Sequence, residues 1–297
     1  MAGASASDAR AAQLQTRRLA GAHYENFSVV SLLLPRRLRQ DFCNVYAFCR
    51  VADDLSDETG DREESLRLLA DFRRQTLDCF AGRAATPVFV ALTRTIESHQ
   101  LPAQPFLDLI DAFEQDQRIL RYQTYEQVLD YCRRSANPVG RLVLYLCGYR
   151  DEPRQLLSDD ICTALQLANF WQDVRRDILE RDRIYLPQDS MDRFGVSERQ
   201  IVQGQCDENF RSLIRFEVNR TAGLFDRGSA LLPLLRPSVR MQVSLFGRGG
   251  RAVLSAIRRQ NYDTLSRRPA LSKWQKGGLI CSTLAAFAGR LVGGGRR

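Results

Sequence analysis

The spacing of apolar residues is the feature that most constrains what this chain can fold into. From about Leu38 onward, apolar residues recur at intervals of three and four, and no stretch alternates convincingly with a period of two. The first spacing lines one face of an α-helix, whereas alternation would indicate strands. Segments of this kind joined by short breaks are typical of helical bundles. The pattern therefore predicts an all-α protein.

Glycine and proline mark most of the expected breaks between helices. We place the breaks at residues 59–60, 82–87, 100–102, 121–124, 149–153, 186–195, 233–237, 247–250 and at Pro269. The glycine-rich stretch Gly247 to Arg251 has the look of a phosphate-binding loop, but it matches no strand-to-helix fingerprint. A flexible bend within a helical run is the better interpretation.

The domain organisation follows from what the chain lacks. No internal repeat of fixed period and no linker composition divides it, so one domain is expected over residues 21–297. Residues 1–20 are rich in Ala, Ser, Gln and Arg and have no clear apolar face. We expect them to form a mobile N-terminal leader outside the fold.

Charge and cysteine usage narrow the function classes. The net charge of +8 favours an anionic partner, which could be nucleic acid, a phosphorylated metabolite or a membrane surface. The eight cysteines include no C-x-x-C pair, and His23 and His99 are far apart, which argues against a structural zinc site. The N-terminus has no secretory apolar run, so we interpret the cysteines as reduced thiols of a cytoplasmic protein.

A first acidic cluster lies in a segment with helical pattern. Asp53 and Asp57 are one turn apart on the same face, and Arg50 lies one turn earlier. Paired carboxylates repel unless positive charge is near, and Mg²⁺ prefers such oxygens while leaving room for substrate phosphates. Alone the cluster is weak, because a solvated acidic helix end has the same sequence.

A second cluster repeats this geometry. Asn169, Asp173 and Asp177 follow one another at intervals of four, and Gln166 precedes them by one turn. Burying such a stripe among apolar residues is costly unless it lines a cavity or holds an ion. Among the arginines that follow, Arg183 is a candidate partner for a diphosphate. Two acidic faces in one helical domain together predict a magnesium and diphosphate site.

The order of these blocks resembles the squalene/phytoene synthase family, from about His23 to Lys273. The resemblance rests on residues 23–28, 46–57, 130–140 and 166–177, the last followed by Arg183-Ile184-Tyr185-Leu186-Pro187. It implies a helical isoprenoid-synthase bundle around a central apolar cavity. It also implies Mg²⁺ as the cofactor, with ligands at Asp53, Asp57, Asn169, Asp173 and Asp177.

The same resemblance implies further site residues. Residues that would contact the diphosphate or the rest of the substrate are Arg50, Gln166, Tyr131, Tyr262, Arg183 and Lys273. With the aspartates, Tyr131, Tyr262 and Asn137 complete the expected catalytic set. Arg267 and Arg268 belong to the same basic group near Pro269, for which surface charge is an equal alternative.

Departures from the family pattern suggest a particular reaction. Condensing members usually carry a serine-rich or lysine-containing block where this chain has Tyr24-Glu25-Asn26, and an arginine where it has Gln172. The stretch from Ser135 to Gly140 is more polar than the usual sequence. It is similar to that of hydroxysqualene synthases of bacterial hopanoid pathways. That likeness implies presqualene diphosphate as the substrate, with Ser135 or Asn137 helping to place the attacking water.

Alternatives remain open at this point. A head-to-head prenyl transferase, joining two prenyl diphosphates, is the main rival; a helical adaptor without enzymatic activity is a second. No nucleic-acid recognition motif and no dinucleotide fingerprint is present. The segment from Trp274 to Arg297 predicts either a helix lying on anionic lipid or a final helix packed on the bundle. The first would place the protein peripherally on the inner face of the cytoplasmic membrane.

Overall fold

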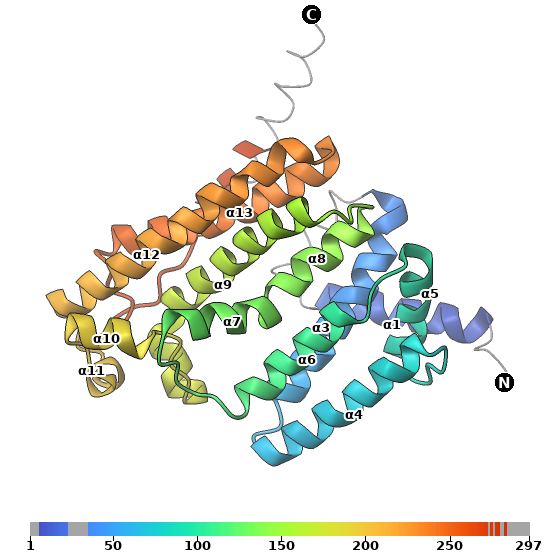
Figure 1. Ribbon diagram of the computed structural model, residues 1–297, viewed down its shortest axis with the longest axis horizontal. Helices are drawn as coiled ribbons and strands as arrows, with labels where there is room; N and C mark the ends of the chain where they lie inside the picture. Colours follow the sequence, from blue (N-terminus) through green and yellow to red (C-terminus); the bar gives the residue numbers. More distant parts are fainter. Residues whose placement is uncertain (1–5, 23–34, 273, 276, 280–281, 284–297) are drawn as a thin grey trace, which may run out of the picture. The chain divides into compact units, whose positions relative to one another are not determined.

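Helices make up all the regular structure that is described for this chain (Figure 1). The computed structural model describes residues 6–22, 35–272, 274–275, 277–279 and 282–283. Within these ranges the only strand-like pairing is an isolated bridge between Arg121 and Ile184. The all-α prediction is confirmed. The chain divides into two compact units, one of residues 1–119 and 133–155, the other of residues 120–132 and 156–297.

The first unit is a set of helices packed around an aromatic core. The ring centroid of Phe48 lies 4.9 Å from those of Phe72 and Phe106, and Phe72 lies 5.0 Å from Phe89. Such edge and tilted contacts add to the free energy gained by burying the rings. The elements of this unit are α1 (Ala6–Ala22), η1 (Arg36–Leu38), α3 (Arg39–Asp57), α4 (Arg62–Phe80), α5 (Pro87–His99), α6 (Gln104–Asp116) and α8 (Asn137–Leu146).

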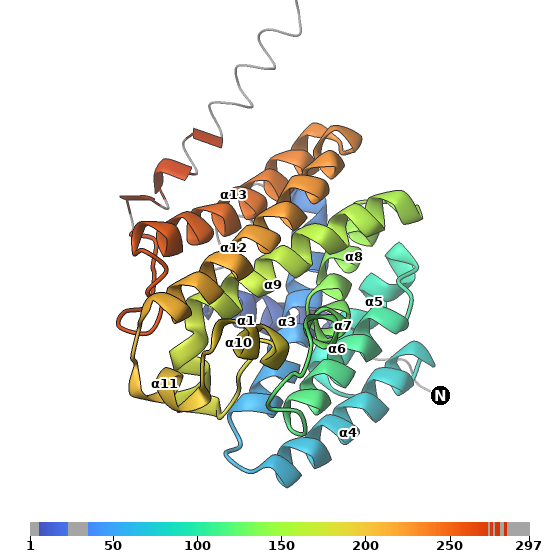
Figure 2. The same cartoon turned by 60° about the vertical axis from the view of Figure 1, so that its left-hand side comes forward.

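The second unit is built on the long helix α9 (Glu152–Arg181), which begins in residues of the first unit. Helices α9, α12 and α13 run alongside one another in both ribbon views (Figure 2). Helix α7 (Tyr125–Ser135) also spans residues of both units. The remaining elements are α10 (Gln188–Phe194), α11 (Glu198–Gln203), α12 (Glu208–Gly228), η2 (Ser229–Leu234) and α13 (Pro237–Arg259).

Side-chain caps explain where several helices begin. Asp61 accepts hydrogen bonds from the backbone N–H groups of Glu63 and Glu64 at 2.8 and 3.3 Å and starts α4. Asp207 accepts from Phe210 at 2.8 Å and starts α12. Each cap satisfies backbone donors that have no partner within the helix.

The N-terminal segment differs from its prediction. Residues expected to form a mobile leader are helix α1 from Ala6 onward, packed against α3 and α5. Thr16 is fully buried and donates a hydrogen bond to Asn44 Oδ1 at 2.7 Å. Small side chains, Ala12 and Ala20, form the rest of the buried stripe. Because alanine and threonine are weakly apolar, the sequence pattern gave no clear face there.

The break predicted at residues 247–250 is also wrong, because α13 runs through it without interruption. A Cβ atom at Gly250 would lie 2.3 Å from the Phe225 ring and 2.8 Å from Leu165 Cδ2. Glycine is therefore required here for close packing of α13 on α12 and α9, rather than for a bend. Similarly, the break predicted at residues 186–195 contains the short helix α10.

Candidate functional site

Arg50 organises the acidic cluster of the first unit. Its guanidinium lies 3.0 Å from Asp53 Oδ2 and 3.1 Å from Glu58 Oε1, and it also forms an ion pair with Asp54. All four residues belong to the end of α3 or follow it directly. Asp57, the last residue of α3, is exposed. The sequence placed Arg50 beside Asp53 correctly, but it missed Asp54, which the i, i+4 spacing from Arg50 would have indicated.

This cluster is open to solvent. The side chains of Asp53 and Glu58 are 43% and 66% exposed, respectively. Tyr46, one turn before Arg50, has its pKa raised by burial, with Arg50 opposing the shift and Asp53 adding to it. The first cluster is therefore a charged, accessible helix end held by an arginine of the same helix.

The cluster of the second unit is buried. Asp173 and Asp177 lie one turn apart on α9, and only 5% and 6% of their surfaces are exposed. Asn169, one turn earlier, is exposed, and Gln166 is half-buried. The stripe predicted from the sequence therefore runs from solvent at Asn169 into the protein at Asp177.

A loop residue neutralises part of this buried charge. Both nitrogens of the Arg268 fork donate to the two oxygens of Asp173, one of them at 2.9 Å. Gln172 donates in turn to the backbone carbonyl of Pro269, so the loop after α13 is fastened to α9 at two adjacent residues. The side chain of Arg268 remains 44% exposed, whereas that of Asp173 is only 6% exposed. The sequence gave no signal for this pair, because its members are 95 residues apart.

Among the described residues, Asp177 has no comparable partner at hydrogen-bonding distance. Its nearest ion pair is with Arg181 Nη1, 3.8 Å away. Burial and the neighbouring charge of Asp173 raise the pKa of Asp177 to about 7, against the opposing effect of Arg181, Arg176 and Arg183. Arg183 is itself buried, and its backbone N–H donates to the carbonyl of Asp177 at 3.1 Å.

The two tyrosines predicted for the site lie in different surroundings. Tyr131 is buried in an aromatic group with Tyr122, Phe170 and Tyr185, and the last two rings stack at 3.7 Å. Tyr262 follows α13 with a left-handed φ of 59°, and its ring is covered by the guanidinium of Arg215 at 5.0 Å.

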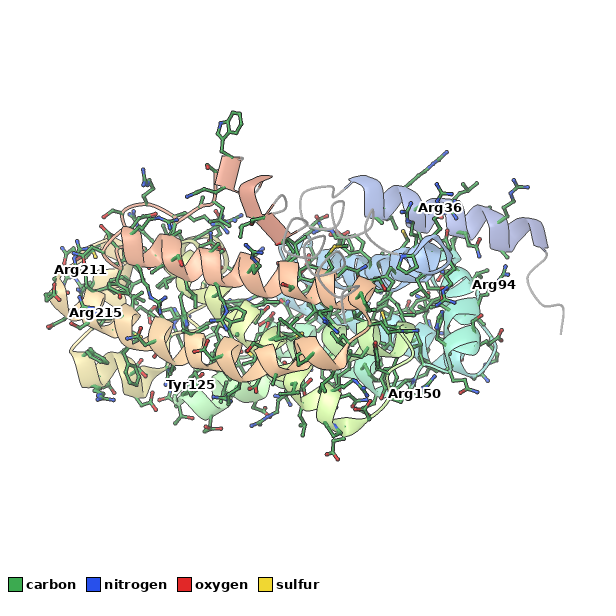
Figure 3. All side chains as sticks on the ribbon, turned by 90° about the horizontal axis from the view of Figure 1, so that it is seen from above. Arg36, Arg94, Tyr125, Arg150, Arg211 and Arg215 are labelled. Atoms are coloured by element: carbon green, nitrogen blue, oxygen red, sulfur yellow. The ribbon has the colours of Figure 1, made fainter. Side chains whose placement is uncertain are left out.

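Two arginines of α12 hold the loop that carries Tyr262. Figure 3 shows Arg211 and Arg215 together at one end of this helix. Arg211 donates to the carbonyl of Asn261 at 2.6 Å, next to Tyr262. Tyr262 is therefore held between contacts of its ring with Arg215 and of the preceding carbonyl with Arg211.

The other predicted residues are placed as follows. Asn137 is buried at the start of α8, and the hydroxyl oxygen of the nearby Ser135 is buried with no hydrogen-bond partner among the described residues. Buried hydroxyls are normally satisfied by protein or by water. Lys273 and the block at residues 23–28 lie outside the described residues.

The donors on α9 are compatible with Mg²⁺. In the described part of the chain, no three His, Cys, Asp or Glu side chains come together as a ready metal cage. However, Mg²⁺ is usually held by one or two carboxylates together with water and substrate phosphates. Asp173 and Asp177 supply two carboxylates on one face of α9, and both are buried, so a bound cation would be favourable there. The residues present therefore fit this ion.

Comparison with known proteins identifies relatives over nearly the whole chain. The sequence model of the family described as "Squalene/phytoene synthase" matches residues 20–275. The hydroxysqualene synthase of Zymomonas mobilis is 30% identical, covering 98% of this chain and 99% of its own. The phytoene synthase of Arthrospira platensis is 29% identical, covering 93% of each chain. Relatives named for both activities are thus about equally similar.

A solved structure supports the fold class. The crystal structure of squalene synthase HpnC from Alicyclobacillus acidocaldarius superposes with a TM-score of 0.82 and 46% sequence identity, covering 87% of this chain and 97% of the other. The isoprenoid-synthase helical fold predicted from the sequence is confirmed. The central apolar cavity stays a prediction.

Proposed function

This chain belongs to the squalene/phytoene synthase family, and on that premise we propose that it converts presqualene diphosphate and water into hydroxysqualene and diphosphate. The carbon–oxygen bond to the diphosphate breaks, and the leaving group takes the electron pair. The cation rearranges, a water oxygen attacks it, and the proton of that water is lost to solvent. The enzyme binds one prenyl diphosphate and does not join its hydrocarbon chain to a second prenyl chain.

The observation that carries the proposal is the buried carboxylate pair on α9. Two aspartates at 5% and 6% exposure, one paired with Arg268 and the other with Arg181 at 3.8 Å, are costly for stability. The pKa of Asp177 is raised to about 7, chiefly by burial. Such a cost is expected where charge is needed for chemistry. Mg²⁺ bound there would neutralise the departing diphosphate.

The remaining site residues take proposed roles from their position in the family pattern. Asp53 and Asp57 would hold Mg²⁺ on α3, and Asn169 would add an oxygen ligand on α9. Diphosphate or substrate contacts are proposed for Arg50, Gln166, Arg183, Tyr131, Tyr262 and Lys273. Because Arg50 already spans three carboxylates, it would also keep that cluster from repelling the substrate's charge in the absence of metal.

Water capture is proposed to depend on two polar residues where α7 ends and α8 begins. The buried hydroxyl of Ser135, which has no partner in the part of the chain that the structure describes, is suited to bind a water molecule, and Asn137 is buried two residues later. The double variant Ser135→Ala, Asn137→Ala should ionise the substrate but yield less of the alcohol. An unchanged alcohol yield would remove both residues from this role.

A head-to-head prenyl transferase is the second candidate, favoured by the 29% identity with a phytoene synthase. Product analysis separates the two. The purified protein with Mg²⁺ is incubated separately with presqualene diphosphate and with farnesyl diphosphate, and products are identified by mass spectrometry. Hydroxysqualene from the first substrate alone supports water capture. Consumption of farnesyl diphosphate would identify a condensing enzyme instead.

Cytoplasmic localisation and peripheral membrane contact through the C-terminal segment also remain proposals. Most of residues 274–297 lie outside the described part of the chain. Among the described residues, none of the helices is both long and apolar enough to cross a bilayer.

A further inference from the structure

Positive charge is concentrated in the last fifth of the chain. Residues 236–297 contain thirteen of the 43 Lys and Arg residues but only one of the 35 Asp and Glu residues, Asp263. This segment therefore has a net charge of +12, and the 235 residues before it have a net charge of −4. The excess charge of the protein belongs to this segment alone, so an anionic partner should meet it here.

Helix α13 presents much of this charge on one side. It contains five arginines, Arg240, Arg248, Arg251, Arg258 and Arg259, and no acidic residue. At 3.6 residues per turn, the five fall within an arc of about 100°. The buried residues of the helix, among them Val239, Gly250 and Ile257, lie on the opposite side. The arginines therefore form a stripe along the side of α13 away from these buried residues, and two of them reach α12.

Few of these charges are neutralised by the protein. In the described part of the chain, Arg251 forms an ion pair with Asp226 at 2.7 Å. The other contacts of the stripe are with neutral oxygens: Arg248 donates to Ser282 at 2.8 Å, Arg240 to the carbonyl of Leu235 at 2.9 Å, and Arg258 to Asn219 at 3.4 Å. Four of the five guanidinium groups thus keep their charge available to a partner.

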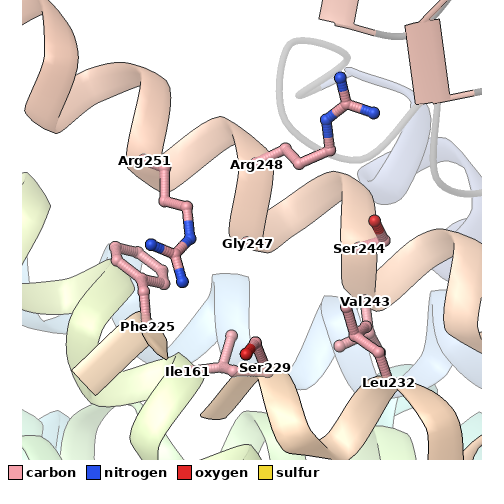
Figure 4. A pocket seen from close by; sticks show the side chains of 9 residues that line it. All are labelled: Ile161, Phe225, Ser229, Leu232, Val243, Ser244, Gly247, Arg248 and Arg251. Carbon is pink, nitrogen blue, oxygen red and sulfur yellow. The ribbon is translucent and has the colours of Figure 1, made fainter. Parts of the chain in front are cut away.

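A hollow lined by both apolar and polar side chains opens beside the stripe. It lies among α9, α12, η2 and α13, and its volume is about 330 Å³ with the open mouth included. Figure 4 shows Arg248 and Arg251 on α13 above apolar side chains from the other elements. Its apolar lining residues are Ile161, Phe225, Leu232 and Val243, and its polar ones are Ser229, Ser244, Arg248 and Arg251. A ligand that has both an anionic head and a hydrocarbon chain would match this combination.

Exposed apolar side chains lie at both ends of α13. Leu234, shortly before the helix, is 43% exposed, and Trp274, after it, is 90% exposed. Tryptophan, arginine and apolar groups together are typical of surfaces that lie at a membrane interface. Nucleic acid would pair with the arginines, but its charged backbone has no hydrocarbon chain to fill the hollow beside them.

We propose that the arginine stripe of α13 and the hollow beside it form a docking surface for membranes rich in anionic phospholipid. Lipid phosphates would pair with the stripe, and an acyl chain would enter the hollow between α12 and α13. The inference does not depend on the reaction proposed above.

Co-sedimentation of the full chain with vesicles tests the charge component. Vesicles of pure phosphatidylcholine are compared with vesicles of equal parts phosphatidylcholine and phosphatidylglycerol. The variant Arg248→Gln, Arg258→Gln, Arg259→Gln should bind the anionic vesicles about 100-fold more weakly, at about fivefold for each arginine. The matched control Arg67→Gln, Arg74→Gln, Arg83→Gln removes the same charge from exposed residues of the first unit. It should bind within about twofold of the unaltered protein.

A second variant tests the hollow. Gly247 lines it, and a Cβ there would meet no atom within 4 Å, so Gly247→Gln can fill the space without disturbing the helix. We expect this variant to lose several-fold in binding to anionic vesicles. Equal binding to both kinds of vesicle, or equal losses in the two triple variants, would overturn the proposal. So would an unchanged Gly247→Gln affinity combined with tighter binding to a single-stranded oligonucleotide, which would assign the stripe to nucleic acid.

Discussion

The two acidic clusters look alike in sequence but differ in how the protein balances their charge. On α3, one arginine of the same helix spans Asp53, Asp54 and Glu58, and the carboxylates are partly or largely exposed. On α9, Asp173 and Asp177 are buried, and the balancing arginine comes from a distant loop. Exposed ion pairs contribute little free energy, whereas uncompensated buried charge is costly. The cluster on α9 should therefore be the more sensitive to metal, mutation and pH.

The largest expected effect is on turnover. Asp173→Asn or Asp177→Asn should slow diphosphate release from presqualene diphosphate by at least about 100-fold, because each removes a charge that would hold Mg²⁺ against the leaving group. Asp160→Asn, on the same helix but paired with Arg227, is the matched control and should retain activity. Thermal melts followed by circular dichroism confirm that each variant is folded. A folded Asp173→Asn enzyme of normal rate would show that α9 does not carry the chemistry.

A smaller effect is expected on metal affinity, where removing an arginine should be a gain rather than a loss. Arg268 occupies both oxygens of Asp173, so Mg²⁺ must compete with it. Arg268→Gln should tighten Mg²⁺ binding without diphosphate by about tenfold, which corresponds to the loss of a charge-assisted contact. Arg50→Gln should tighten it by no more than about threefold, because the carboxylates of α3 are more exposed. Isothermal titration measures both; weaker binding in Arg268→Gln would mean that this arginine supports the metal site instead.

The smallest effect is on stability as a function of pH. The pKa of Asp177 is raised to about 7 in the folded protein, above the usual value near 4 of an unfolded aspartate. Between these values the folded state binds more protons, so this group's contribution to stability decreases as pH rises from about 4 to about 7. In EDTA, Asp177→Asn should flatten the fall in Tm over this range by several degrees, whereas the exposed Asp57→Asn should not. Equal slopes of Tm against pH in the unaltered protein, Asp177→Asn and Asp57→Asn would contradict the burial of Asp177.

The helices and the site differed in how well the sequence predicted them. Apolar periodicity predicted the all-α fold, and helical spacing placed Arg50 beside Asp53 and Asp173 one turn from Asp177, because these are local properties of one helix. Periodicity failed at α1, where alanine and threonine form the buried face. It failed again at Gly250, where glycine allows close packing rather than a turn.

Long-range pairing was beyond the reach of sequence patterns. Arg268 stood in the sequence only as one of several basic residues near Pro269, yet it forms an ion pair with Asp173. That contact depends on the path of the loop after α13 and on the burial of α9. Neither property is encoded in residue spacing.

Equilibrium binding of Mn²⁺, followed by electron paramagnetic resonance, tests most directly whether α9 forms a metal site that acts on a diphosphate. The ion is titrated into the unaltered protein and into Asp173→Asn, each with and without inorganic pyrophosphate. We predict that pyrophosphate strengthens Mn²⁺ binding to the unaltered protein and that Asp173→Asn loses this gain. Mn²⁺ affinity that does not change with pyrophosphate, or that changes equally in both proteins, would contradict the proposed site.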